Sequence, residues 1–260
     1  MKHHHRIILT IVILIIIAFA FSYFSTPKKA AAPINKQTSA VPTPDQTGEV
    51  KAVATKIDED ASNTPSVAVE YPQFPALPAD FNTTIAKSVN DRLADFRATV
   101  KDNDASRKAT ALPSELAIPL SAYSFIATWE PIQVNNKYVS VIVRYDAYAG
   151  GANGDQELET FNYDVGANKI LALVDLFPNS SDYLKQISVL VRKDLTASMD
   201  KASDGNVPTD MLNAGTEPTA DNFMNFTFTD DAVTFYFPKY AVAPGSFGEQ
   251  KATIARSLVK

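Results

Sequence analysis

The clearest candidates for acid–base chemistry are three carboxylates in one short segment: Asp155, Glu157 and Glu159. A glycosidase needs two carboxyl groups, one protonated and one ionised. Glu157 and Glu159 would share one face of a β-strand, too close for an inverting pair and near the separation of a retaining pair. The same charges are typical of an exposed edge strand that resists aggregation. We favour the edge strand and keep a carboxylate-based glycan hydrolase as the alternative.

Other catalytic residue types are scarce in this chain of 260 residues. It contains no Cys, and its three His are residues 3 to 5. The remainder therefore offers no cysteine nucleophile, no Ser-His-Asp triad and no His-ligated zinc site. Residues 200–205 begin like a calcium loop, but Ala202 and Met211 occupy positions that need oxygen ligands. We expect no cofactor and no metal, and we predict a binding protein, not an enzyme.

A glycine pair and two tyrosines indicate a recognition surface. Gly150 and Gly151 could cradle an anion, but neither a Lys nor a helix start follows them, so we favour a hairpin turn that requires positive φ. Tyr148 and Tyr240 lie at strand ends beside turns, where an aromatic ring can serve surface recognition. The predicted ligand-binding residues are Tyr148, Gly150, Gly151, Asn153, Asp155 and Tyr240.

The elements that must position these residues follow from hydrophobic spacing. Apolar residues recur every three or four positions over residues 81–100, which predicts a helix capped by Asp80. A second stripe over residues 184–199 predicts a helix after Pro178, with Ser180 or Ser181 as its N-cap.

Between and after the helices the period changes to two. Alternation predicts strands over residues 123–129, 139–147, 161–165, 226–228 and 233–237, and the apolar run 170–174 predicts another. Asn135-Asn136 and Asp230-Asp231 are expected to form turns. Because successive strands are joined by short turns, we predict an α+β fold: a largely antiparallel sheet with the two main helices packed on one face.

The N-terminal region has a different character. The apolar run over residues 7–24 is long enough to span a bilayer, after a cytoplasmic stub of residues 1–6. A signal peptide cleaved after Ala20 or Ala32 is the alternative. Residues 25–65 are rich in Pro, Ala and Thr, and we predict a linker there; residues 51–60 could form a short helix but have too few apolar residues for a packed face. Residues 66–260 are the predicted exported domain.

Charge separates the two regions. Residues 1–60 hold 7 of the 24 Lys+Arg and 5 of the 29 Asp+Glu, which leaves residues 61–260 with a formal charge of −7. An acidic surface is a poor match for nucleic acid and a better one for a basic partner.

Four separated motifs in this order resemble a known extracytoplasmic module. They are Val69-Glu70-Tyr71-Pro72-Gln73, Tyr148-Ala149-Gly150-Gly151-Ala152-Asn153, the segment from Phe161 to Phe177, and Tyr240-Ala241-Val242-Ala243-Pro244 with Gly248. The module is found in RsiV-type anti-sigma factors and PdaC-type peptidoglycan deacetylases. Asn153 stands where the family usually has His, and Gly245 stands where a Tyr commonly follows the Pro.

The resemblance implies a recognition module. In the anti-sigma factors the related ectodomain binds lysozyme; in the deacetylases a similar region accompanies a metal-dependent catalytic domain. We therefore predict a single-pass membrane protein with a cytoplasmic N-terminus and an extracytoplasmic domain that binds a cell-wall hydrolase, such as lysozyme, or wall glycan. A weak glycan hydrolase and a non-catalytic subunit of an envelope assembly are the alternatives.

Overall fold

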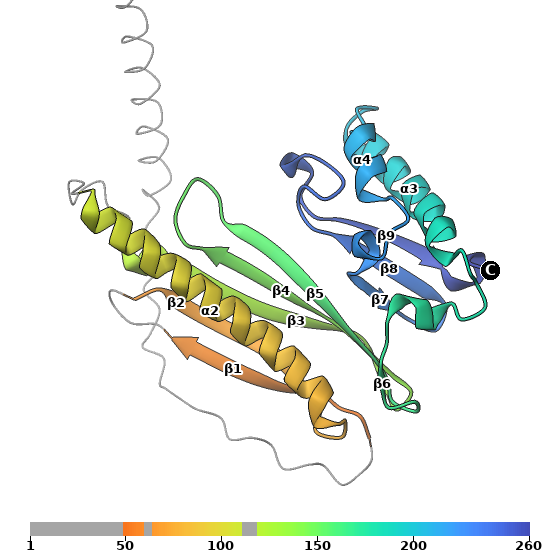
Figure 1. The fold of residues 1–260 in the computed structure, drawn as a ribbon, viewed down its shortest axis with the longest axis horizontal. Helices are drawn as coiled ribbons and strands as arrows, with labels where there is room; N and C mark the ends of the chain where they lie inside the picture. The colour runs from red at the N-terminus through yellow and green to blue at the C-terminus, as the bar shows by residue number, and fades with distance from the viewer. Residues whose placement is uncertain (1–48, 60–63, 111–118) are drawn as a thin grey trace, which may run out of the picture. The chain divides into compact units, whose positions relative to one another are not determined.

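A computed structural model describes residues 49–59, 64–110 and 119–260 (Figure 1). All of these residues belong to one compact unit of the chain, residues 36–260. The predicted stub, the predicted membrane span over residues 7–24 and most of the predicted linker lie outside the described residues. Among the residues that are described, no helix is long and apolar enough to cross a membrane.

A six-stranded sheet forms the first half of the described chain. Its strands lie side by side in the order of the sequence: β1 (Val53–Glu59), β2 (Ser66–Gln73), β3 (Ser124–Val134), β4 (Tyr138–Tyr148), β5 (Asp155–Asp164) and β6 (Lys169–Ile170). Neighbouring strands are antiparallel except β2 and β3, which are parallel. The parallel pair is possible because the long helix α2 (Ala79–Ala109) follows β2 and returns the chain across the sheet.

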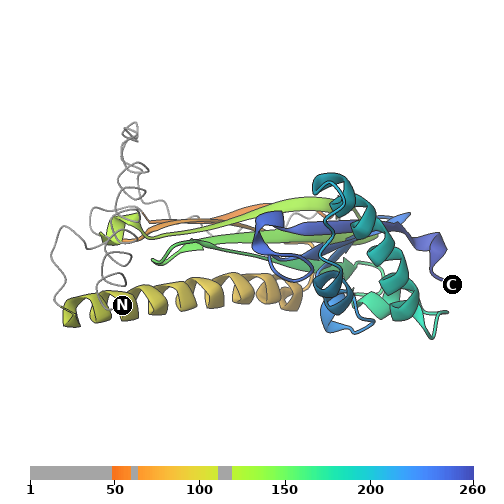
Figure 2. The ribbon, with the colours of Figure 1, turned by 90° about the horizontal axis from the view of Figure 1, so that it is seen from above.

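Helix α2 covers one face of this sheet (Figure 2). The six apolar residues that predicted the helix are at most 5% exposed, which confirms the stripe. They pack against inward-facing residues of β2 to β5, among them Phe125, Val141 and Tyr163. The predicted cap is wrong: Pro78 precedes the helix, and the Asp80 carboxylate in its first turn accepts a hydrogen bond from the Phe81 N–H at 2.9 Å.

A second sheet forms the C-terminal half. It contains β7 (Phe226–Phe228), β8 (Ala232–Phe237) and β9 (Gln250–Ala255), all antiparallel. Helix α3 (Tyr183–Ala202) packs on β9, and the short helix α4 (Thr209–Gly215) contacts α3. Asp182 precedes α3, whereas the hydroxyl of Ser180 donates to the carbonyl of Lys260 at 2.6 Å, so neither predicted serine caps this helix.

The predicted fold class is confirmed as α+β with mostly antiparallel strands, but its layout needs correction. The strands form two sheets, and each has its own main helix and its own hydrophobic cluster. The single sheet with two helices on one face is therefore wrong. Periodicity identifies which residues are buried, but it does not state against which sheet they pack.

Two local predictions also differ from the structure. Residues 53–59, inside the predicted linker range and the suggested short helix, form β1 and pair with β2. The apolar run after Lys169 is a strand only through Ile170 and then continues as a short 3-10 helix, Leu173–Leu176. Leu171 and Leu173 are buried in the second hydrophobic cluster, so the run connects the two sheets and does not extend the first one.

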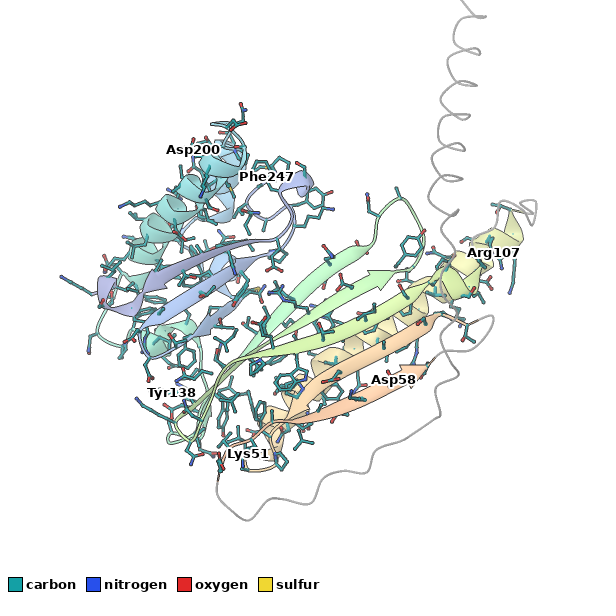
Figure 3. All side chains as sticks on the ribbon, turned by 180° about the vertical axis from the view of Figure 1, so that it is seen from behind. Lys51, Asp58, Arg107, Tyr138, Asp200 and Phe247 are labelled. Atoms are coloured by element: carbon teal, nitrogen blue, oxygen red, sulfur yellow. The ribbon has the colours of Figure 1, made fainter. Side chains whose placement is uncertain are left out.

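The two sheets meet through a small interface. Ile142 and Leu158 of the first sheet pack with Tyr236 of the second. The ring of Tyr138, at the start of β4 (Figure 3), lies 5.2 Å from that of Phe228. Since β5 borders this interface, the edge of β5 that is not paired with β4 faces residues of the C-terminal half.

Candidate functional site

A groove of about 680 Å³ runs beside β5. One wall is β5 itself over residues 155–160, with Arg92 of α2 beside it. The opposite wall comes from residues 224–225 and 238–240 of the C-terminal half. A smaller pocket of about 270 Å³ adjoins it at the β4–β5 turn and shares Asn153, Asp155 and Lys239. The two sheets together thus build a polar groove that neither could form alone.

Arg92 organises the charges on the β5 wall. Its Nε donates to Oε1 of Glu159 at 2.8 Å, and its guanidinium also pairs with the carboxylate of Glu157. The same guanidinium carbon lies 4.7 Å from the centre of the Tyr145 ring. Glu159 accepts a further hydrogen bond from the hydroxyl of Ser88. One arginine therefore fixes both glutamates of the strand.

The arrangement bears on the glycosidase alternative. Glu157 and Glu159 do share a face of β5, as the alternation predicts, because both reach Arg92 on the helix above that face. A glycosidase needs one of the two carboxyls as a proton donor. In the structure both carboxylates are instead engaged by the same guanidinium, and neither stands apart as a separate group. The geometry therefore does not favour this alternative.

Tyr145 lies beneath the Arg92 cluster and is 3% exposed. Its hydroxyl and that of Ser88 are 3.1 Å apart. Burial raises the pKa of Tyr145 to about 12, and the nearby carboxylate of Glu159 adds to the rise. The phenol therefore stays neutral and supports the cluster from inside the sheet.

Tyr240 forms the exposed part of the opposite wall. It is 61% exposed and has a φ of 74°, an unusual backbone conformation for a residue with a side chain. Its ring covers Gly245, and the ammonium of Lys239 lies 5.4 Å from the ring centre. An exposed ring held in a strained backbone conformation is characteristic of binding sites.

The structure brings together three of the predicted site residues and separates the others from the groove. Asn153, Asp155 and Tyr240 line it. Tyr148 lines the smaller pocket with Asn153 and Asp155. Gly150 and Gly151 line neither pocket; their φ values of 105° and 99° form the turn that joins β4 to β5.

Tyr148 has a mainly supporting position. Its hydroxyl donates to the carbonyl of Gly151 at 3.1 Å, and its ring lies 6.3 Å from that of Tyr123. The side chain is half-buried against the first hydrophobic cluster. Tyr148 therefore braces the glycine turn, and Tyr240 offers the more accessible ring.

Sequence reasoning missed Arg92 and Lys239. Arg92 could have been noticed because it lies one helical turn after Ser88, beside the buried stripe of α2. Nothing in the sequence pairs it with Glu159, 67 positions away. Among the described residues, no group of three or more His, Cys, Asp or Glu is arranged to hold a metal ion.

Two protein families match successive parts of the chain. The family described as "Deacetylase PdaC" matches residues 57–156, and the family described as "Protein of unknown function (DUF3298)" matches residues 174–257. The first match covers most of the six-stranded sheet, and the second covers α3 and the second sheet.

Individual relatives match different shares of the chain. The peptidoglycan-N-acetylmuramic acid deacetylase PdaC of Bacillus subtilis is 29% identical over 85% of this chain and 43% of its own length. An esterase of Mycobacterium tuberculosis is 25% identical over 46% of this chain and 50% of its own length. The chain thus spans about half the length of these curated relatives.

A solved structure supports the fold. A DUF3298-family protein from Bacteroides fragilis superposes with a TM-score of 0.56 at 17% identity, over 80% of this chain and 91% of that one. At this identity the likeness concerns the fold alone.

One prediction is contradicted by these comparisons. The chain was expected not to be an enzyme, but a relative that matches 85% of it is a peptidoglycan deacetylase, and a deacetylase family matches residues 57–156. The expectation rested on the scarcity of His and Cys in this sequence. The relative's chain extends well beyond the matched part, which is 43% of its length.

The resemblance to PdaC-type deacetylases is confirmed by matches on both halves of the fold. The chain is therefore similar to PdaC and DUF3298 proteins over both halves of the fold.

Proposed function

We propose that this chain takes part in the N-deacetylation of peptidoglycan and holds a wall glycan strand in the groove beside β5. The relative that matches most of the chain is named for deacetylation of peptidoglycan N-acetylmuramic acid. The esterase relative is also a hydrolase, so both names describe cleavage of an acyl group. The proposal includes an extracytoplasmic position for residues 66–260, where wall glycan is present.

The observation that carries the proposal is the pairing of Tyr240 with polar groups across the groove. A sugar presents an apolar face of C–H groups and a rim of hydroxyl and amide groups. An exposed aromatic ring suits the first, and the amide of Asn153 and the carboxylate of Asp155 suit the second. Asp155 forms no ion pair with any residue in the described part of the chain, so its oxygens remain available to a ligand.

The test uses peptide-free N-acetylglucosamine oligomers and acetylated wall sacculi. We expect the full chain to bind both and to release acetate from the sacculi. Tyr240→Ala should weaken oligomer binding by about 1 to 3 kcal/mol, because the stacking ring is lost. Tyr240→Phe keeps the ring and should bind within about 0.5 kcal/mol of the parent protein.

Leu258→Ala is the matched control, because Leu258 is 54% exposed and does not line the groove. Binding unchanged in Tyr240→Ala would remove the groove from the proposal. Sacculi that are not retained at all would overturn it. Retention without release of acetate would limit this chain's contribution to holding the glycan.

A further inference from the structure

β5 has an unpaired edge inside the groove. The strand pairs with β4 along its whole length, but it pairs with β6 only at Tyr163 and Asp164. No strand in the described ranges pairs with residues 155–162 on that side. In Figure 1 this edge of β5 borders the C-terminal half, opposite the β1 edge of the sheet.

Two hydrogen bonds show which backbone groups point into the groove. The N–H of Val165 bonds to the carbonyl of Lys137 on the β4 side, and the carbonyl of Asn162 accepts from Leu171 on the β6 side. Backbone groups alternate between the two sides along a strand. Gln156, Leu158 and Thr160 therefore direct both N–H and C=O away from β4, toward the groove.

The C-terminal half turns this edge into a slot. Residues 224–225 and 238–240 form the opposite wall, and Met224 is 67% exposed there. The N–H of Phe226 bonds to the hydroxyl of Thr160 at 3.0 Å and closes one end. Leu158 is 3% exposed and packs against Tyr236, so the open part of this edge is residues 155–157, about 10 Å long and enough for three residues of an added strand.

The charge of the slot selects what can enter. Four carboxylates line it and its adjoining pocket: Asp146, Asp155, Glu157 and Glu159. The groove holds two cationic residues, Arg92 and Lys239, and Arg92 is already paired with both glutamates. A second copy of β5 would bring like charges face to face and is disfavoured. A segment with basic side chains is complementary.

From these features we infer that an extended polypeptide segment with basic side chains adds as a strand to β5. Its backbone pairs with Gln156, and a cationic side chain meets the carboxylate of Asp155. Strand addition of this kind obtains affinity from main-chain hydrogen bonds and selectivity from side-chain charge. The inference goes beyond the proposed function, because it concerns a protein partner and backbone pairing, not glycan stacking.

The first test uses synthetic peptides and the unchanged full chain. Acetylated, amidated Lys-Val-Lys-Val-Lys should bind, with affinity that falls as salt rises. Glu-Val-Glu-Val-Glu should not bind. Methylation of the backbone nitrogens of the three lysines blocks one edge of the peptide, and methylation of those of the two valines blocks the other edge. One methylated peptide should therefore lose binding, and the other should keep it. Equal binding of both methylated peptides, or binding of the Glu peptide, would overturn the inference.

The second test changes one backbone group of β5. Gln156→Pro removes an N–H that points into the slot and is compatible with an edge strand, whereas Gln156→Ala keeps it. Both variants lose the hydrogen bond from Gln156 to Asp146, so they form a matched pair. We expect Gln156→Pro to weaken peptide binding about tenfold relative to Gln156→Ala. Equal affinities would overturn the inference, while glycan binding through Tyr240 could persist.

Discussion

At the scale of single residues, Gly245 explains how Tyr240 keeps its place. A Cβ at position 245 would overlap the ring carbons and the hydroxyl of Tyr240, so glycine leaves room for the ring in its present position. The Tyr that the family resemblance leads one to expect at this position would meet the ring of Tyr240, which occupies that space. The departure noted in the sequence thus has a steric counterpart in the structure.

This contact predicts the effect of Gly245→Ala. The added methyl group must displace the ring, so we expect glycan affinity to fall about as far as in Tyr240→Ala, while stability changes by less than about 0.5 kcal/mol because the displaced atoms are the outer end of an exposed side chain. Binding titrations and denaturant unfolding measure the two effects. The double variant Gly245→Ala/Tyr240→Ala is the control, because the methyl group then meets no ring and the affinity should equal that of Tyr240→Ala. A Gly245→Ala protein with unchanged affinity would contradict the steric account.

Tyr145 predicts a loss of stability at alkaline pH. Burial raises the pKa of this phenol to about 12 in the folded protein, from 10 in the unfolded chain. Because the pKa is higher in the folded state, the folded protein keeps the phenol proton to a higher pH than the unfolded chain does. The contribution of Tyr145 to the free energy of unfolding is therefore fully present below pH 10 and is lost between pH 10 and 12, by about 3 kcal/mol in total.

The measurement compares denaturant unfolding of the parent protein and Tyr145→Phe at several pH values. The variant lacks the titrating group, so its free energy of unfolding should fall less steeply between pH 10 and 12. Burial also raises the pKa values of Tyr71, Tyr163 and Tyr236, so the variant is expected to retain part of the slope. Identical slopes in the two proteins would show that Tyr145 does not contribute.

At the scale of elements, α2 owes its position to one buried stripe. Leu93 is 2% exposed in the middle of that stripe. Leu93→Ala should destabilise the protein by about 2 to 5 kcal/mol, since it removes buried methyl groups and leaves a cavity. Asp95→Ala, on the exposed side of the same helix, should change stability by less than about 0.5 kcal/mol. Thermal unfolding of both variants provides the measurement, and equal melting temperatures would contradict the packing.

The elements also show what a sequence can predict. Strong periodicity predicted α2, α3 and the β3–β4 pair, because each repeats its apolar residues over many positions. β1 was missed because Val53 is 37% exposed and its apolar pattern is weak; its stability depends on pairing with β2. Local patterns carry little information about such a strand.

The candidate site was only partly predictable for a related reason. The turn after β4 has a local glycine signal, and Asn153 and Asp155 follow directly from it. The groove, in contrast, combines Arg92, β5 and Tyr240, which are far apart in sequence. Periodicity within one element does not state which element will lie opposite, so the second wall and the role of Arg92 needed the structure.

At the scale of the whole molecule, a buried polar cluster joins the two sheets. The hydroxyl of Ser140 donates to the amide oxygen of Asn162 at 2.6 Å, and Asn162 Nδ2 donates to the carbonyl of Phe226 at 2.8 Å. The hydroxyl of Ser140 also accepts the N–H of Phe228 at 3.1 Å. Both side chains are buried. The first family match ends at residue 156, inside β5, and the second begins at residue 174, so the cluster joins the two matched segments: Ser140 lies in the first, and Phe226 and Phe228 lie in the second.

Asn162→Leu should therefore uncouple the halves as well as destabilise them. Leu has a similar volume but leaves the Phe226 carbonyl and the Ser140 hydroxyl without that partner, at a cost of about 1 to 3 kcal/mol for each buried group. Trp129 is the chain's only Trp and packs against the first hydrophobic cluster, so its fluorescence follows the first sheet, while far-ultraviolet circular dichroism follows both. The two signals should coincide during thermal unfolding of the parent protein and separate in Asn162→Leu.

Asn206→Leu, at an exposed position, is the control and should keep them together. Coincident transitions in Asn162→Leu would mean that the apolar contacts of Ile142, Leu158 and Tyr236 suffice to hold the groove's two walls as one cooperative unit.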